Sequence, residues 1–129
     1  VGISVQGNQK LTIENTEISL TDNVGFQYGI YKQIDGVVTI GTNNTFNITS
    51  DYGGVGIGVG DVDSNNLTME SFFNTTLTGS GSEYGLSDMY IGGGTTNECE
   101  AYADNKLETG QTALIYDDTT EEYFIYTAN

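Results

Sequence analysis

Hydrophobic and polar residues alternate with a period of two along most of this chain. The alternation begins at Val1, Ile3 and Val5, and it recurs in short runs separated by turn residues roughly every 8–12 positions. Residues 98–103 alternate in the same way. A period of two is typical of half-buried strands, and no run shows a convincing helical period of 3.6 residues. The pattern therefore predicts an all-β protein.

Turn residues separate the predicted strands. Asp35-Gly36 lies between two β-branched apolar runs and predicts a β-hairpin with a type I′ turn. Residues 117–120 predict a second hairpin between the last two strands. A slip in the alternation near Asn15-Thr16 suggests a β-bulge, and residues 104–105 suggest a further turn.

Residues 54–60 form an unusual predicted strand. Val55, Ile57 and Val59 face one side, and the other side carries only glycine. A bare glycine face costs about 0.5–1 kcal/mol per residue relative to alanine, and it is tolerated where a backbone or an aromatic ring must approach closely. A phosphate-binding loop is not expected, because no Lys follows the glycines. The strict alternation favours a closely packed strand, and a flexible glycine-rich loop is the alternative.

The length of 129 residues suits one β-domain with a single core, spanning residues 1–129. Short strands with frequent turns favour an antiparallel sandwich or sheet, which could continue across subunits. The sequence contains no exact internal repeat, which counts against a regular solenoid.

Composition then narrows the function classes. Three Lys stand against 18 Asp and Glu, the formal net charge is −15, and Arg, His, Pro and Trp are absent. Nucleic acids and anionic membranes require a basic surface that this chain lacks. No apolar run approaches the ~20 residues of a membrane helix. We expect no nucleic-acid partner and no membrane insertion.

Enzymatic function is not expected. Without His, the usual general base and the Ser-His-Asp triads are missing. Asp117-Asp118 and Glu121-Glu122 offer neighbouring carboxylates of the kind that glycoside hydrolases use. We interpret them as a solvated turn, because chains this acidic produce such pairs by chance and because charge runs usually face solvent.

One segment resembles the start of a calcium loop. Asp61, Asp63 and Asn65 have the spacing with which three oxygens converge on a hard cation. The EF-hand template then fails, because Asn66 stands where it requires Gly and Phe72 where it requires Glu. A polar turn is the simpler interpretation, and a weak Ca²⁺ site is the alternative. No other cofactor is expected.

Several features suggest export to the cell surface. Four Asn-x-Ser/Thr sequons are glycosylation candidates, at Asn43, Asn47, Asn66 and Asn74. The chain begins at Val1 rather than Met, which is consistent with removal of a leader or with trimming. Together with the acidity, these features predict an extracellular protein.

Cys99 is the one cysteine, and it has two interpretations. It lies between Glu98 and Glu100, whose charges should raise the pKa of the thiol. A free Cys is often a small buried apolar residue. In an exported protein, an unpaired Cys instead suggests a disulfide to another chain.

Self-association is the function that this pattern favours. Strand edges are normally protected by Lys or Pro, and this chain has three Lys and no Pro. We expect an extracellular structural subunit that assembles edge to edge with copies of itself into a sheath, tube or filament. The strands of Val1, Ile3 and Val5 and of Val55, Ile57 and Val59 are the assembly candidates. The alternative is a secreted, monomeric lectin- or adhesin-like β-sandwich that binds carbohydrate or protein at an aromatic-lined site.

The alternating run 55–60, the sequons, the acidity and the lone Cys99 together resemble archaeal cell-surface proteins. In character the chain is most similar to the subunits of the tubular sheaths that encase some methanogens. This resemblance implies β-sheets that are continuous across subunits and stabilised by disulfides. The chain departs from archaeal filament subunits in lacking an N-terminal hydrophobic helix.

Overall fold

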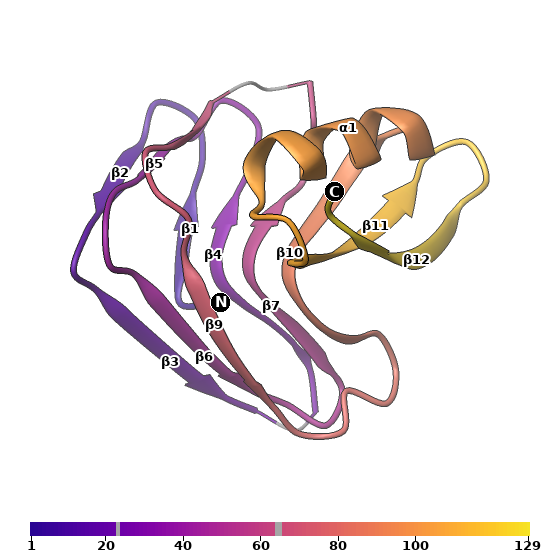
Figure 1. The fold of residues 1–129 in the computed structure, drawn as a ribbon, viewed down its shortest axis with the longest axis horizontal. Coiled ribbons are helices and arrows are strands. Elements are labelled where there is room, and N and C mark those ends of the chain that lie inside the picture. The colour runs from indigo at the N-terminus through magenta and orange to yellow at the C-terminus, as the bar shows by residue number, and fades with distance from the viewer. Residues whose placement is uncertain (23, 64–65) are drawn as a thin grey trace.

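The chain forms a parallel β-solenoid in which three sheets surround one apolar core. A computed structural model describes residues 1–22, 24–63 and 66–129 (Figure 1). Sheet A contains, in spatial order, β1 (Ile3–Val5), β4 (Phe26–Lys32), β7 (Gly53–Val59), β10 (Gly85–Gly94), β11 (Thr112–Asp117) and β12 (Glu122–Thr127). Sheet B contains β2 (Lys10–Ile13), β5 (Val37–Ile40) and β8 (Leu67–Met69). Sheet C contains β3 (Glu17–Thr21), β6 (Thr45–Thr49) and β9 (Asn74–Thr78).

Each coil of the solenoid visits sheets A, B and C in turn, so that equivalent residues stack on one another. Ile3, Ile30 and Ile57 are aligned in adjacent parallel strands of sheet A at intervals of 27 residues. The next interval in the same sheet, from Ile57 to Met89, is 32 residues. Parallel strands need long connections. Between β1, β4, β7 and β10 each connection is the rest of a coil, and between β10 and β11 it contains the helix of residues 96–106.

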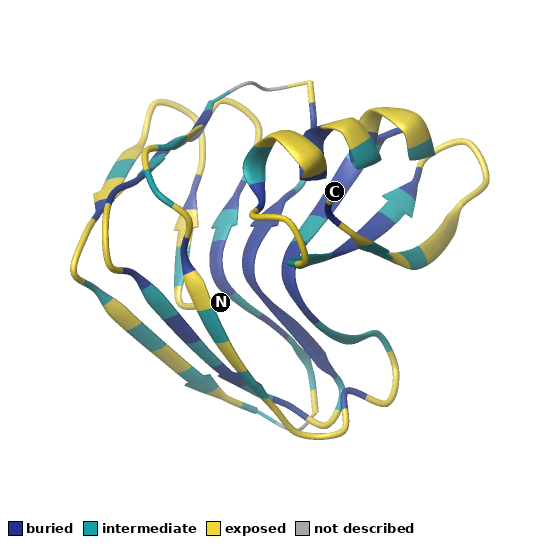
Figure 2. Cartoon of the chain, viewed as in Figure 1, coloured by how far each residue is buried: buried dark blue, intermediate teal, exposed yellow. Residues whose placement is uncertain are grey.

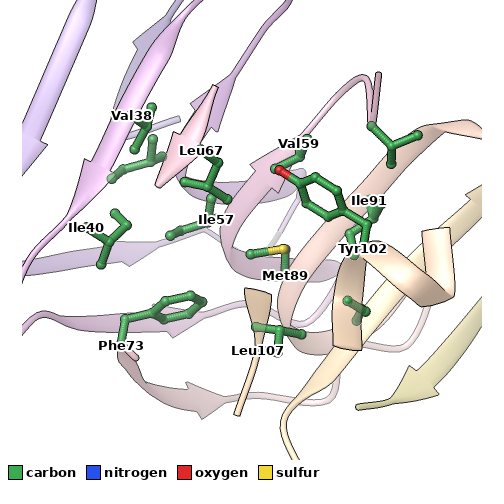
Figure 3. Packing of buried hydrophobic residues seen from close by; sticks show 14 of the residues in the cluster. Val38, Ile40, Ile57, Val59, Leu67, Phe73, Met89, Ile91, Tyr102 and Leu107 are labelled. Carbon is green, nitrogen blue, oxygen red and sulfur yellow. The ribbon is translucent and has the colours of Figure 1, made fainter. Parts of the chain in front are cut away.

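The core consists of ladders of identical or similar apolar residues. Ile30, Ile57 and Met89 are all fully buried in sheet A, and Figure 3 shows Ile57 and Met89 among the packed side chains of the core. Ile40 and Phe46 supply equally buried side chains from sheets B and C. The whole length of β7 is buried (Figure 2), because its inner face packs in the core and the rings of Tyr28 and Tyr31 cover its outer face at Gly58.

The central strands of sheet A bend in the middle. At Gly29 and Ile30, two successive residues face the interior: a Cβ on Gly29 would meet the Phe46 ring of sheet C, and Ile30 belongs to the core. Gly56 and Ile57 repeat this arrangement in the next coil. The bend interrupts the simple alternation, so residues 28 and 31 of β4 lie on the same outer face.

Asparagine and aspartate residues form the corners between the sheets. Asn15, Asp35 and Asn43 adopt positive φ angles of 51–64°, which these residue types tolerate better than most. Asn44 is fully buried, and its side chain donates to the carbonyl oxygens of Ile13 and Gly41 at 3.0 and 3.1 Å. It thereby joins the second coil to the first.

The helix α1 (Thr96–Lys106) closes the C-terminal end of the solenoid. Thr95 and Glu98 form a reciprocal capping box at its start. Tyr102 packs toward Val59 and Ile91 (Figure 3). At the end of the helix, Lys106 Nζ donates a hydrogen bond to the carbonyl oxygen of Leu67 in β8 at 2.7 Å. This bond satisfies a carbonyl group at the edge of sheet B.

Several sequence predictions are confirmed and several are wrong. The strand at 54–60 and the terminal hairpin of β11 and β12 are confirmed. The predicted all-glycine face of that strand is wrong, because Gly54 and Gly56 face the interior and Gly58 faces outward. The antiparallel sandwich is wrong, because β11–β12 is the antiparallel pair and the other pairings among the described strands are parallel. The argument against a solenoid fails because the repeat lies in burial and register rather than in residue identity.

Three local predictions are corrected for related reasons. Asp35-Gly36 does not close a hairpin, because β4 and β5 belong to different sheets and the turn is a corner. The slip near Asn15-Thr16 is likewise a corner between sheets B and C rather than a bulge. Residues 98–105 lie in α1 and form neither a strand nor a turn. Among the described residues, no helix has the length and apolarity needed to cross a membrane.

Candidate functional site

The outer face of sheet A carries a continuous group of aromatic side chains. Seven of the nine tyrosines of the chain belong to it, and each ring contacts at least one other. We call this group the aromatic cluster: Phe26, Tyr28, Tyr31, Tyr52, Tyr84, Tyr90, Tyr116 and Tyr123. It joins β4 and β10 to the terminal hairpin and to the loops that precede β7 and β10.

The rings meet at edges and tilts rather than in parallel stacks. Phe26 and Tyr84 are edge to face with centroids 5.9 Å apart, and Tyr84 meets Tyr123 at 5.1 Å. Tyr28 meets Tyr90 edge to face at 6.2 Å. These are the favoured geometries of aromatic pairs, so the contacts help to hold the rings of the cluster in place.

Glycines of the neighbouring strands make room for the rings. A Cβ on Gly58 would lie 2.5 Å from Cδ1 of Tyr28 and 2.9 Å from Cδ1 of Tyr31. A Cβ on Gly60 would lie 2.6 Å from the hydroxyl of Tyr31, and one on Gly92 would lie 2.6 Å from that of Tyr90. The expected close approach of aromatic rings to the glycine-rich strand is therefore confirmed.

The cluster surrounds a pocket of about 350 Å³, the size range of small-molecule sites. Its lining is uncharged: Val24, Gly25, Phe26, Tyr28, Tyr52, Tyr84, Tyr90, Leu114 and Tyr123. Tyr123 is 48 % exposed and stands at the rim on β12. Such a pocket offers flat apolar faces together with phenol hydroxyls.

The phenols of Tyr28 and Tyr90 in the pocket stay neutral well above neutral pH. Burial, and to a smaller extent the charges of Tyr31, Tyr123 and Tyr84, raise the pKa of Tyr28 to about 12. Burial and then Tyr123 and Tyr28 raise the pKa of Tyr90. As neutral phenols, these side chains both donate and accept hydrogen bonds.

In its described residues, 61–63, the predicted calcium segment forms a polar turn. The Asp61 carboxylate accepts a hydrogen bond from the backbone N–H of Asp63 at 2.9 Å. Asn65 lies outside the described residues. In the described part of the chain, no group of three or more His, Cys, Asp or Glu residues is arranged to hold a metal ion.

Cys99 takes the buried position that one of its two interpretations expects. Its side chain is fully buried in α1, and its sulfur is free. Burial raises the pKa of the thiol to about 11, with smaller contributions from Asp118, Glu98 and Asp117. A disulfide to another chain would require this thiol to leave the interior.

The remaining candidates occupy different surroundings. Asn43 and Asn74 are exposed, whereas Asn47 and Asn66 are partly buried and Asn47 donates to Ser19 Oγ at 3.0 Å. β7, with Val55, Ile57 and Val59, is bonded on both sides by β4 and β10, so its backbone is not open to another subunit.

The strand of Val1, Ile3 and Val5 is different, because β1 lies at the edge of sheet A and is bonded on one side by β4.

Asp117 departs from the predicted solvated turn. It is 5 % exposed, and its carboxylate accepts hydrogen bonds from the backbone N–H groups of Thr96, Thr119 and Thr120 at 2.7–3.0 Å. These bonds, with one from the Thr96 hydroxyl, lower the pKa of Asp117 to about 2. Its role is to tie the start of α1 to the terminal hairpin.

The aromatic pocket was not predicted residue by residue. Its members come from five separate parts of the sequence, and the bend in β4 places the neighbouring Tyr31 on the same face as Tyr28. The usable signal was the run of glycines at 54–60, because Gly58 and Gly60 leave room for rings from elsewhere in the chain.

Comparisons with known proteins identified no relative of this chain. No family model and no curated protein matches this sequence, and no solved structure matches the fold.

Proposed function

We propose that this chain is an extracellular binding module that recognises a neutral carbohydrate in the aromatic pocket of sheet A. The observation that carries the proposal is the uncharged pocket of about 350 Å³ lined by Phe26 and five tyrosines. A binding module is expected to have a discrete aromatic-lined site. The proposal takes up the lectin- or adhesin-like alternative on a solenoid scaffold in place of a sandwich.

The chemistry of the pocket suits a sugar ring. The C–H faces of a pyranose are apolar and pack on aromatic rings, while its hydroxyls need donors and acceptors at the edge. Tyr28, Tyr84 and Tyr90 supply both from the same side chains. The ligand also meets a protein of net charge −15, so acidic sugars are disfavoured at long range.

Tyrosine fluorescence provides a direct test, because the chain has no Trp and most of its tyrosines lie in the cluster. Neutral oligosaccharides that bind on a glycan array should change this emission on titration. Tyr123→Ala should weaken binding at least tenfold. Phe72→Ala is the matched control, because Phe72 is 49 % exposed and does not line the pocket.

The proposal fails if no neutral glycan binds to the array, or if Tyr123→Ala and Phe72→Ala bind equally well.

Self-association is a second candidate function, and the evidence for it comes from the first coil, which contains β1, β2 and β3. β1, β2 and β3 are each bonded on one side, by β4, β5 and β6. Val5 and Ile13 of this coil are buried, but four other inward apolar residues remain partly exposed, whereas the partners of those four in the second coil are fully buried. The partly exposed residues are Ile3, Leu11, Ile18 and Leu20.

A second copy that pairs with these edges would bury both the backbone groups and the apolar side chains. This is the route by which we propose that copies could form a sheath, tube or filament. Sedimentation and negative-stain electron microscopy at physiological salt should show oligomers that Leu11→Lys disperses and Phe72→Lys does not. A monodisperse monomer of the unmodified chain would rule this candidate out.

A further inference from the structure

We propose that the ligand is a linear oligosaccharide of several sugar units that lies along β4 across two adjoining pockets. This inference rests on the proposed carbohydrate-binding function and adds the length and path of the ligand. It follows from a second hollow of about 630 Å³ at the far end of β4.

The second pocket lies at the corner between sheets A and B, and it differs from the aromatic pocket in chemistry. Its lining includes Gln6, Tyr31, Gln33, Ile34, Asp35 and Gly60. Gln6 and Gln33 supply two amides, Asp35 supplies a carboxylate, and Tyr31 supplies one aromatic ring. Hydroxyl-rich sugar units pair with such groups through hydrogen bonds.

Two tyrosine rings connect the pockets. Tyr28 lines the first pocket and Tyr31 lines the second, and their ring centroids are 4.7 Å apart. Both rings lie on the backbone of Gly58, and the Tyr31 hydroxyl reaches Gly60. The glycines therefore form the floor of one continuous aromatic path rather than of two unrelated hollows.

The bend of β4 is what places the two rings on one face. In a regular strand, residues three apart point to opposite faces. Because Gly29 and Ile30 both face the interior, Tyr31 returns to the outer face beside Tyr28. Gly56 and Ile57 bend β7 at the same level, so the floor follows the same course.

The length of the path exceeds a short sugar. From Phe26 to Ile34, a strand at about 3.3 Å per residue spans up to about 26 Å. A monosaccharide or disaccharide fills one pocket and leaves the other empty. A longer chain contacts both, so its second set of contacts forms without a second loss of translational freedom.

An oligosaccharide fits this path better than an extended peptide does. Peptides that bind sheets pair with the backbone of an edge strand. The path runs over β4, whose backbone is already bonded by β1 on one side and by β7 on the other. Recognition here depends on side chains and aromatic faces, which is the way in which sugars are held.

Calorimetry with neutral β-linked and α-linked glucose oligomers of one to six units tests the inference, together with any neutral series found on the array. Affinity should rise about tenfold or more between the disaccharide and the hexasaccharide. Gln33→Ala should remove most of that gain and leave disaccharide binding unchanged. Tyr123→Ala should weaken short and long oligomers alike, and Asn74→Ala, an exposed amide in sheet C, is the control.

The outcomes separate the two proposals. If no neutral oligosaccharide binds, the proposed function fails. If oligomers bind with an affinity that does not depend on length, or if Gln33→Ala weakens the disaccharide as much as the hexasaccharide, the extended path is wrong and the single pocket stands. Preferential binding of an extended peptide would overturn both.

Discussion

The ring of Tyr28 lies on the backbone of Gly58, with 2.5 Å between the Cδ1 of the ring and the position that a Cβ would occupy. Gly58→Ala should therefore displace Tyr28 and Tyr31 together. We expect a loss of about 1–3 kcal/mol in the free energy of unfolding, as for other overpacked sites, and a loss of the path between the pockets. Urea denaturation measures the first effect and glycan titration the second.

Gly25→Ala is the control for this substitution. A Cβ on Gly25 would meet its nearest neighbour, a carboxylate oxygen of Asp22, at an ordinary 3.8 Å. The free energy of unfolding of the Gly25→Ala variant should therefore differ little from that of the unmodified protein. Equal destabilisation by the two substitutions would contradict the contact between the tyrosine rings and the glycine floor.

Asn44→Ala should loosen the join between the first and second coils. The side chain of Asn44 donates to Ile13 and Gly41, and it accepts from the backbone N–H of Thr16 at 3.1 Å. Unpaired buried groups cost about 1–3 kcal/mol each, so we expect a total loss of about 2–4 kcal/mol by chemical denaturation. Asn74→Ala, at an exposed position, should stay within about 0.5 kcal/mol of the unmodified protein.

Two buried serines should respond oppositely to the same substitution. Ser87 Oγ has no hydrogen-bond partner within the described residues, so Ser87→Ala should be neutral or stabilising by up to about 1 kcal/mol. Ser50 Oγ accepts from the backbone N–H groups of Tyr52 and Gly53. Ser50→Ala should therefore destabilise by about 1–3 kcal/mol. Thermal unfolding of both variants checks the pair, and similar losses would contradict the assignment.

Asp117 should make stability depend on acid pH. The folded protein lowers the pKa of this carboxyl from 3.8 to about 2, chiefly through the Thr96 hydroxyl. Its contribution is therefore complete above pH 4 and is lost as pH falls toward 2. The urea midpoint of the unmodified protein should fall across this range. Asp117→Asn should be less stable at neutral pH and should lack this part of the dependence, whereas Asp118→Asn, at an exposed position, should retain it.

Cys99 should be chemically silent in the folded protein. Its side chain is fully buried, and burial raises the pKa of its thiol to about 11, so the reactive thiolate is scarce at neutral pH. A thiol reagent should label it slowly in buffer and fully in denaturant. Disulfide-linked dimers on a non-reducing gel of native material would contradict the buried position.

The sequence predicted which residues are buried better than it predicted their neighbours. Alternation predicts that Val55, Ile57 and Val59 share a face; all three are buried in one strand, but the bend at Gly56 and Ile57 places Val55 on the outer face, so the shared face is wrong. Alternation carries no information on whether the adjacent strand runs parallel or comes from 27 residues away. Asp35-Gly36 shows the same limit, because positive φ at Asp35 serves a solenoid corner as well as a hairpin.

The helix was hidden for a different reason. In 98–103 the small and polar residues happen to alternate, and the side that α1 buries is narrow: Cys99, Tyr102 and Ala103. The readable signal was the capping box of Thr95 and Glu98. The tyrosine pocket depends on the stacking of coils and on the bend at Gly29, so its composition follows from register and not from local sequence.

The glycine floor has a thermodynamic consequence for binding. Tyr28, Tyr31 and Tyr90 rest on the glycine backbone of β7 and β10, so these side chains are already held before any ligand arrives. Fixing a mobile side chain on binding costs about 0.5–1.5 kcal/mol. Here folding has already restricted these side chains, so binding loses less conformational entropy and the affinity for the bound sugar is higher.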